Sequence, residues 1–180
     1  MRISAMRRCM TLLACLLCAV PLGAQKERRE PLNEKQIEEV REAGAFPDQR
    51  IGLYTKYLNE RAETLKALAK RAKGAARSHR LNEELLDFTA LMDELGSNLD
   101  QYGDRKADLR KALKKLNEDA PQWLEMLHAL PSEAGFDLAQ KEAVESCRDL
   151  AEEASAMLKQ QTDYFAVHKD ESGQEREEPK

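Results

Sequence analysis

The sequence has few of the features from which enzymes and sheet proteins are usually built. Only 5% of its residues are aromatic, and β-branched residues nowhere form the alternating runs that are typical of strands. No Gly-rich phosphate loop, G-x-S-x-G nucleophile motif or C-x-x-C-H haem motif is present. We therefore expect an all-α protein without a sheet, and we expect that it is not an enzyme.

The first 24 residues resemble a removable export signal. Three arginines form a basic start, and the apolar stretch "CMTLLACLLCAVPLG" is too short to span a bilayer comfortably. Ala24 is a small residue suited to precede the cleavage point. This predicts a periplasmic or secreted protein with no transmembrane segment in the mature chain. A lipid anchor on Cys15, which follows "LLA", is the alternative.

Removal of this segment changes the cysteine count and the charge. Cys9, Cys15 and Cys18 leave with it, so only Cys147 remains and no internal disulfide can form. The segment carries three cations and no acid, which leaves 26 Lys and Arg against 33 Asp and Glu, a net charge of −7. The acidic balance argues against bulk binding of nucleic acid. Stability must come from helix packing.

The rest of the chain divides into a charged linker at 25–31, one helical domain at 32–168 and a disordered charged tail at 169–180. Asn33 is suited to cap a short first helix, and Gly44 to close it. Pro47 is suited to the first turn of a second helix, predicted over about 47–73.

A third helix is predicted from the longest apolar seam in the chain. Leucines and aromatic residues recur three and four positions apart, and Lys106 is the one break in this spacing. The spacing favours a continuous helix over 79–117, about 58 Å long. Pro121 then either kinks this helix or begins another, "PQWLEMLHAL", capped by Asp119. A last helix is predicted over 136–167. The result is an elongated antiparallel up-down bundle with three long helices and one or two short ones.

The stretch from Met92 to Leu113 crowds glycines and aspartates as a calcium loop does. An EF-hand frame fails, because Leu109 stands where the bidentate Glu is needed. If the third helix continues through this stretch with the same apolar spacing, four aspartates lie on its solvated outer face: Asp93, Asp100, Asp104 and Asp108. We predict no metal site and no cofactor.

Gly96 and Gly103 lie one heptad apart and so share one stripe of the predicted helix. Each costs about 1 kcal/mol relative to alanine in a helix interior. We predict a packing notch, with the ring of Tyr54 or Tyr57 over the gap; a kink is the alternative.

Two further groups could carry chemistry. Glu125 and His128 have the E-x-x-H spacing of di-iron bundles, but such sites need a second copy, and neither His79 nor His168 supplies one. Cys147 falls on the inward stripe of the last helix, which favours a buried structural thiol; an intermolecular disulfide is the alternative.

Cations concentrate at the turn between the second and third helices. Six occur with no intervening acid: Lys66, Lys70, Arg71, Lys73, Arg77 and Arg80. One interpretation is a solvated tip that Glu83, Glu84 and Asp87 partly neutralise. The other is a contact for an anionic surface, such as lipid headgroups or an acidic polymer of the cell envelope.

The stretch "FTALMDELGSNLDQYGDRKADLRKAL", Phe88 to Leu113, resembles uncharacterised exported helical proteins of bacteria. The resemblance implies an exported bundle and carries no activity or ligand.

Three functional hypotheses follow. The first is a non-enzymatic interaction or structural module that binds a partner protein or an envelope surface, with a homo-oligomer as a variant. The second is a metal- or haem-binding four-helix carrier that uses Glu125, His128 and a methionine. The third is a periplasmic holdase chaperone.

Overall fold

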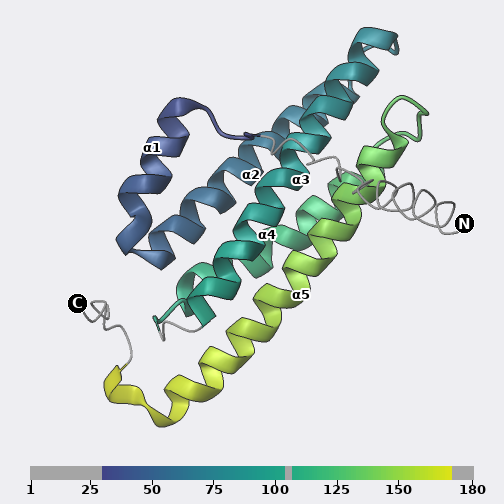
Figure 1. The fold of residues 1–180 in the computed structure, drawn as a ribbon. Helices are drawn as coiled ribbons and strands as arrows, with labels where there is room; N and C mark the ends of the chain where they lie inside the picture. Colours follow the sequence, from purple (N-terminus) through teal and green to yellow (C-terminus); the bar gives the residue numbers. More distant parts are fainter. Residues whose placement is uncertain (1–29, 104–106, 172–180) are drawn as a thin grey trace, which may run out of the picture.

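The computed structural model describes residues 30–103 and 107–171, most of which are helical (Figure 1). The elements in chain order are α1 (Glu34–Glu42), η1 (Ala43–Ala45), α2 (Pro47–Ala69), α3 (Ala75–Gly103), α4 (Arg110–Ala129), α5 (Asp137–Val167) and η2 (Lys169–Glu171). These two stretches contain no strand, which confirms the all-α prediction. The predicted signal peptide lies outside the described residues, as do 172–180 of the predicted tail.

The four long helices form two antiparallel hairpins, α2 with α3 and α4 with α5 (Figure 1). The hairpins pack so that α2 also contacts α4, and α3 also contacts α5. α3 and α5 run in the same direction, because Ser146 Oγ donates to Asp93 Oδ1 (2.7 Å) and, further along both helices, Gly103 lies beside Met157. Chain direction alternates along the sequence, and α3 and α4 lie diagonally opposite each other in the bundle.

The start of the bundle follows local sequence rules. Asn33 and Gln36 form a capping box at α1, in which each side chain accepts a hydrogen bond from the other residue's backbone N–H (3.0 and 3.1 Å). Pro47 occupies the first turn of α2, where its missing N–H leaves no helical bond unmade. The predicted starts of these two helices are therefore confirmed.

The third helix was predicted to continue to residue 117, and this prediction is wrong. α3 ends at Gly103 and α4 begins at Arg110. Gln161 of α5 holds the connection, since its Oε1 accepts from the Leu109 N–H (2.7 Å) and its Nε2 donates to the Ala107 carbonyl (2.8 Å). An apolar seam keeps its period within each of two helices, so periodicity alone could not reveal the break. The bundle consequently has four long helices rather than three.

Pro121 does not start a helix either, because it lies in the interior of α4. Its side chain lies on the exposed face of α4, and its missing N–H leaves one helical carbonyl without its usual donor. Asp119, predicted as a cap, is instead buried in mid-helix.

The centre of the core joins the two hairpins across the bundle diagonal. The rings of Phe88 on α3 and Trp123 on α4 meet edge to face, with centroids 6.1 Å apart and planes at 90°. The predicted seam is buried around them, including Leu58, Leu95 and Leu113. Burial of this apolar surface is the main favourable term in the stability of the bundle.

Asn59 of α2 satisfies the polar atoms at this centre. Trp123 Nε1 donates to Asn59 Oδ1 (2.7 Å), and Asn59 Nδ2 donates to Asp119 Oδ2 (2.8 Å). Lys115 Nζ completes the network by donating to Asp119 Oδ1 (2.8 Å). The network fixes α2 against α4, because a sliding of either helix would leave buried polar groups without partners.

Asn59→Ala is expected to destabilise the protein by about 2–3 kcal/mol, because it leaves the buried Trp123 N–H and one oxygen of Asp119 unsatisfied. Urea denaturation followed by circular dichroism would measure the change. Asn117→Ala is the matched control, since among the described residues that amide donates to the Leu113 carbonyl of its own helix and to no other helix. It should change stability by less than about 0.5 kcal/mol. Equal losses in the two variants would contradict a central role for Asn59.

Candidate functional site: the basic end of the bundle

The turn between α2 and α3 forms one end of the molecule (Figure 1). Lys70, Arg71, Lys73 and Arg80 are exposed there, and we call these four residues the basic tip. Among the described residues, Lys70, Arg71 and Arg80 form no ion pair, and Lys73 reaches Glu133 at 3.8 Å. The tip therefore presents a locally uncompensated positive charge on a protein whose predicted mature chain is acidic.

Two of the six cations in the predicted contact have other roles. Lys66 Nζ lies 2.7 Å from Glu63 on its own helix. Arg77 is buried, and this corrects its assignment to the contact surface. Its guanidinium pairs with Glu133 and donates to the Ala69 carbonyl (3.2 Å) at the end of α2. The sequence spacing could not show this, because Glu133 lies far along the chain.

Of the three acids that were expected to neutralise the tip, Glu84 and Asp87 pair with Arg61. Glu84 Oε1 and Asp87 Oδ2 lie 2.8 and 3.3 Å from Arg61 Nη1. Arg61 lies on α2, and its guanidinium also donates to the Pro31 carbonyl. Glu84 and Asp87 thus help to hold the α2–α3 hairpin together rather than to compensate Lys70 or Arg71.

The turn between α4 and α5 packs against the start of α3. Glu133 accepts hydrogen bonds from Arg77 and from Ser78 Oγ (3.0 Å), and the Arg77 bond holds the pKa of this carboxyl below its usual range. Gly135 comes so close to α3 that an added Cβ would lie 3.0 Å from Ser78 Cβ. This contact brings the two turns together at one end of the bundle.

The predicted packing notch lies toward the other end of α3, where Gly96 faces α5. A Cβ at Gly96 would lie 3.3 Å from Glu153 Oε2, and one at Gly103 would lie 3.8 Å from Met157 Cε. The neighbour at the predicted notch is therefore α5, and the expectation of a tyrosine ring there is wrong. Tyr54 instead donates to Glu94 (2.7 Å), and Tyr57 donates to Glu39.

Glu153 is held in an environment that disfavours its charge. Burial raises its pKa to about 7, and the neighbouring Asp100 carboxylate contributes both by repulsion and by accepting a hydrogen bond. Glu153 Oε1 is buried without a hydrogen-bond partner. No sequence pattern marked this residue, because the pairing joins two helices that are distant in sequence.

The aspartates of the rejected calcium loop separate in space. Asp93 and Asp100 are exposed on α3, as expected of a solvated face. Asp108 lies in the α3–α4 connection instead, where it binds Arg110 through two contacts of 2.8 and 2.7 Å. Asp104 falls outside the described residues. In the part of the chain that the structure describes, no group of three or more His, Cys, Asp or Glu side chains could hold a metal ion.

The remaining candidates for chemistry are isolated. Glu125 and His128 both lie on the exposed face of α4, whereas a bundle metal site needs inward ligands. Cys147 is buried, its thiol is 3.6 Å from the Ala120 carbonyl, and burial raises its pKa to about 11. A thiol in this state is a poor nucleophile.

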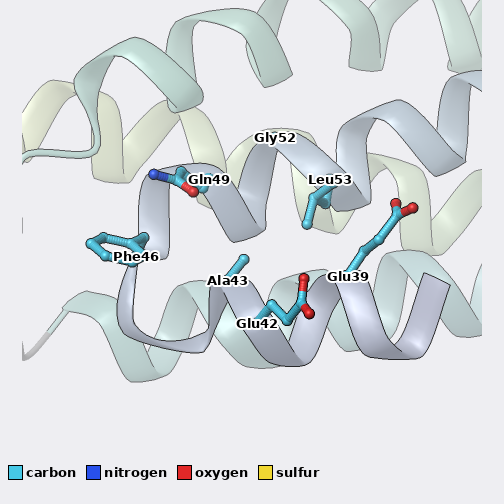
Figure 2. A pocket seen from close by; sticks show the side chains of 7 residues that line it. All are labelled: Glu39, Glu42, Ala43, Phe46, Gln49, Gly52 and Leu53. Carbon is cyan, nitrogen blue, oxygen red and sulfur yellow. The ribbon is translucent and has the colours of Figure 1, made fainter. Parts of the chain in front are cut away.

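A shallow groove of about 410 Å³ opens between α1 and α2 (Figure 2). Phe46 and Leu53 contribute apolar side chains to its lining, and Glu39 and Glu42 contribute carboxylates. Glu39 is already bonded to Tyr57, so the groove offers few free polar groups to fix a ligand.

The chain matches no family profile, no curated protein and no solved structure. None of the described helices is long and apolar enough to cross a membrane. The resemblance to exported bacterial helical proteins stays a prediction.

Glu153→Gln is expected to make stability less dependent on pH. A raised pKa means that the folded state binds more protons than the unfolded state between about pH 4.5 and 7, so wild-type stability falls as pH rises through this window. The variant should therefore be more stable at pH 8 by about 1–2 kcal/mol, allowing for solvent screening. Urea titrations at pH 4 and pH 8 would measure this difference. Glu152→Gln, at an exposed neighbour, is the control; a parallel pH dependence in all three proteins would contradict the expectation.

Gly96→Ala tests the close approach of α5. At Gly52 in α2 an added Cβ meets nothing within 4 Å, so Gly52→Ala should stabilise by about 0.5–1 kcal/mol through helix propensity. Gly96→Ala should increase the stability by less, because its added Cβ must displace the Glu153 carboxylate. In a Glu153→Ala background, Gly52→Ala and Gly96→Ala should increase the stability equally. Thermal unfolding would measure all of these changes, and an equal gain in the wild-type background would argue against a packing role.

Proposed function

We propose that this protein is an exported, non-enzymatic interaction module that contacts an anionic partner or envelope surface through the basic tip. The observation that supports the proposal is the exposure of Lys70, Arg71, Lys73 and Arg80 at one end, with Glu133 the one acid within ion-pair distance of them among the described residues. Glu133 is itself paired with the buried Arg77.

The overall charge makes the tip the natural point of contact. A mature chain of net charge −7 is repelled as a whole by an anionic surface, so the molecule must bind with the basic tip facing that surface. The charges are exposed and therefore screened by salt, which makes such binding weaken steeply with ionic strength.

A holdase function has less support. Among the described large apolar side chains, the exposed ones are Leu138 and Val167, at 71% and 76%. Unfolded clients need a continuous apolar surface, and two separate side chains do not provide one.

Reversal of the tip charge should abolish the interaction. The variant carries Lys70→Glu, Arg71→Glu, Lys73→Glu and Arg80→Glu, and should bind an immobilised polyanion at least about a hundredfold more weakly, since each cation contributes about 1 kcal/mol. Retention on heparin resin across a salt series, and crosslinking capture from an envelope fraction, would measure this. The crosslinking step also identifies the partner.

The matched control reverses four exposed lysines outside the tip. These are Lys35, Lys111, Lys114 and Lys159. This variant has the same net charge as the tip variant, so it separates a local contact from bulk repulsion. Equal loss of binding in both variants, or unchanged binding in the tip variant, would overturn the proposal.

A further inference from the structure

Of the two large apolar side chains that are exposed in the described part of the chain, one lies at the end of the bundle that carries the basic tip. Leu138 is 71% exposed in the first turn of α5. It directly follows the α4–α5 turn, which packs on the start of α3. The second such side chain, Val167, ends α5, at the opposite end of the molecule (Figure 1).

The Arg77–Glu133 ion pair holds Leu138 in this position. Glu133 is bound by Arg77 and Ser78 of α3, and its backbone N–H donates to Asp137 Oδ1 (2.7 Å). Asp137 is the residue before Leu138 and begins α5. A short path of bonded groups therefore connects the base of the basic tip to the exposed leucine, and Lys73 lies 3.8 Å from the same Glu133.

Two acids at this end are paired with cations, whereas Asp137 is hydrogen-bonded only to uncharged groups among the described residues. Glu133 is neutralised by Arg77, and Asp137 accepts from Ser132 Oγ (3.2 Å) as well as from the Glu133 N–H. Glu63 pairs with Lys66. The four cations of the basic tip outnumber this one carboxylate, so this end offers a partner a net positive charge beside one apolar side chain.

We infer that this end of the bundle binds the surface of an anionic phospholipid bilayer, with the four cations against the headgroups and Leu138 inserted at the acyl boundary. The inference rests on the proposed function and names its partner. A bilayer surface is the partner class that supplies a dense negative charge directly above an apolar phase. A soluble polyanion supplies the charge alone, and it would leave Leu138 in water.

The experiment compares Leu138→Ser with Val167→Ser in the full chain. Both side chains are exposed, so neither substitution removes core packing, and they differ in which end of the bundle they occupy. Binding is measured by co-sedimentation with vesicles of mixed phosphatidylcholine and phosphatidylglycerol, with pure phosphatidylcholine vesicles, and on heparin resin. Leu138→Ser should weaken binding to the anionic vesicles about fivefold or more and leave heparin binding unchanged. Val167→Ser should change neither.

Insertion can also be observed directly. Trp123 is buried in the core, so a tryptophan introduced by Leu138→Trp is the one that lipid can reach. Brominated phospholipids in the anionic vesicles should quench its fluorescence, whereas a tryptophan introduced by Val167→Trp should not be quenched.

The outcomes separate this inference from the proposed function. Binding that depends on the basic tip but is unaffected by Leu138→Ser, with no quenching at position 138, would overturn the lipid inference and leave an electrostatic contact. Heparin binding without any vesicle binding would do the same and point to an acidic polymer. Binding that is also insensitive to tip charge would overturn both.

Discussion

The edge-to-face contact between Phe88 and Trp123 is the interaction on which the arrangement of the bundle depends. The two rings come from helices that are diagonal neighbours, so their contact decides how one hairpin sits on the other. Cys147 is a free buried thiol, and no disulfide substitutes for packing in the described residues. A buried indole also needs an acceptor for its N–H, and Asn59 supplies one. The central pair therefore sets the position of α2 as well, through the bond from Asn59 to Asp119.

The packing of the two hairpins brings the α2–α3 and α4–α5 turns together at one end of the molecule. Once α3 and α5 run side by side, the α4–α5 turn must lie near the α2–α3 turn, because both hairpins close at the same end (Figure 1). Arg77 is then buried against the partly exposed carboxylate of Glu133. Loss of Glu133 would leave the buried guanidinium without its ion-pair partner, which is costly, so this pair specifies the relative position of the two turns.

The sequence predicted features that depend on local chemistry, and it failed where distant segments meet. The capping box at Asn33 and the helix start at Pro47 needed only neighbouring residues. The break after Gly103 was missed because α3 and α4 both bury their seams, and the cap for the connection comes from Gln161, more than fifty residues later. The burial of Arg77 and the pairing of Glu153 with Asp100 required knowledge of which helices are neighbours. The sequence showed a run of six cations without an acid, but it could not distinguish the buried Arg77 from the exposed residues of the basic tip.

The two charged features of α3 are far enough apart to act independently. On α3, Asp100 lies 20 residues after Arg80 of the basic tip, which is roughly 30 Å along a helix. This distance is several times the Debye length of about 8 Å at physiological ionic strength, so the carboxyl pair of Glu153 and Asp100 does not sense charge bound at the tip. Protonation of Glu153 relieves repulsion between α3 and α5 at the far end, while the Arg77–Glu133 pair holds the near end together. A change of pH near 7 should therefore alter the stability of the bundle without altering the electrostatics of the contact surface, whereas salt should act mainly on that surface.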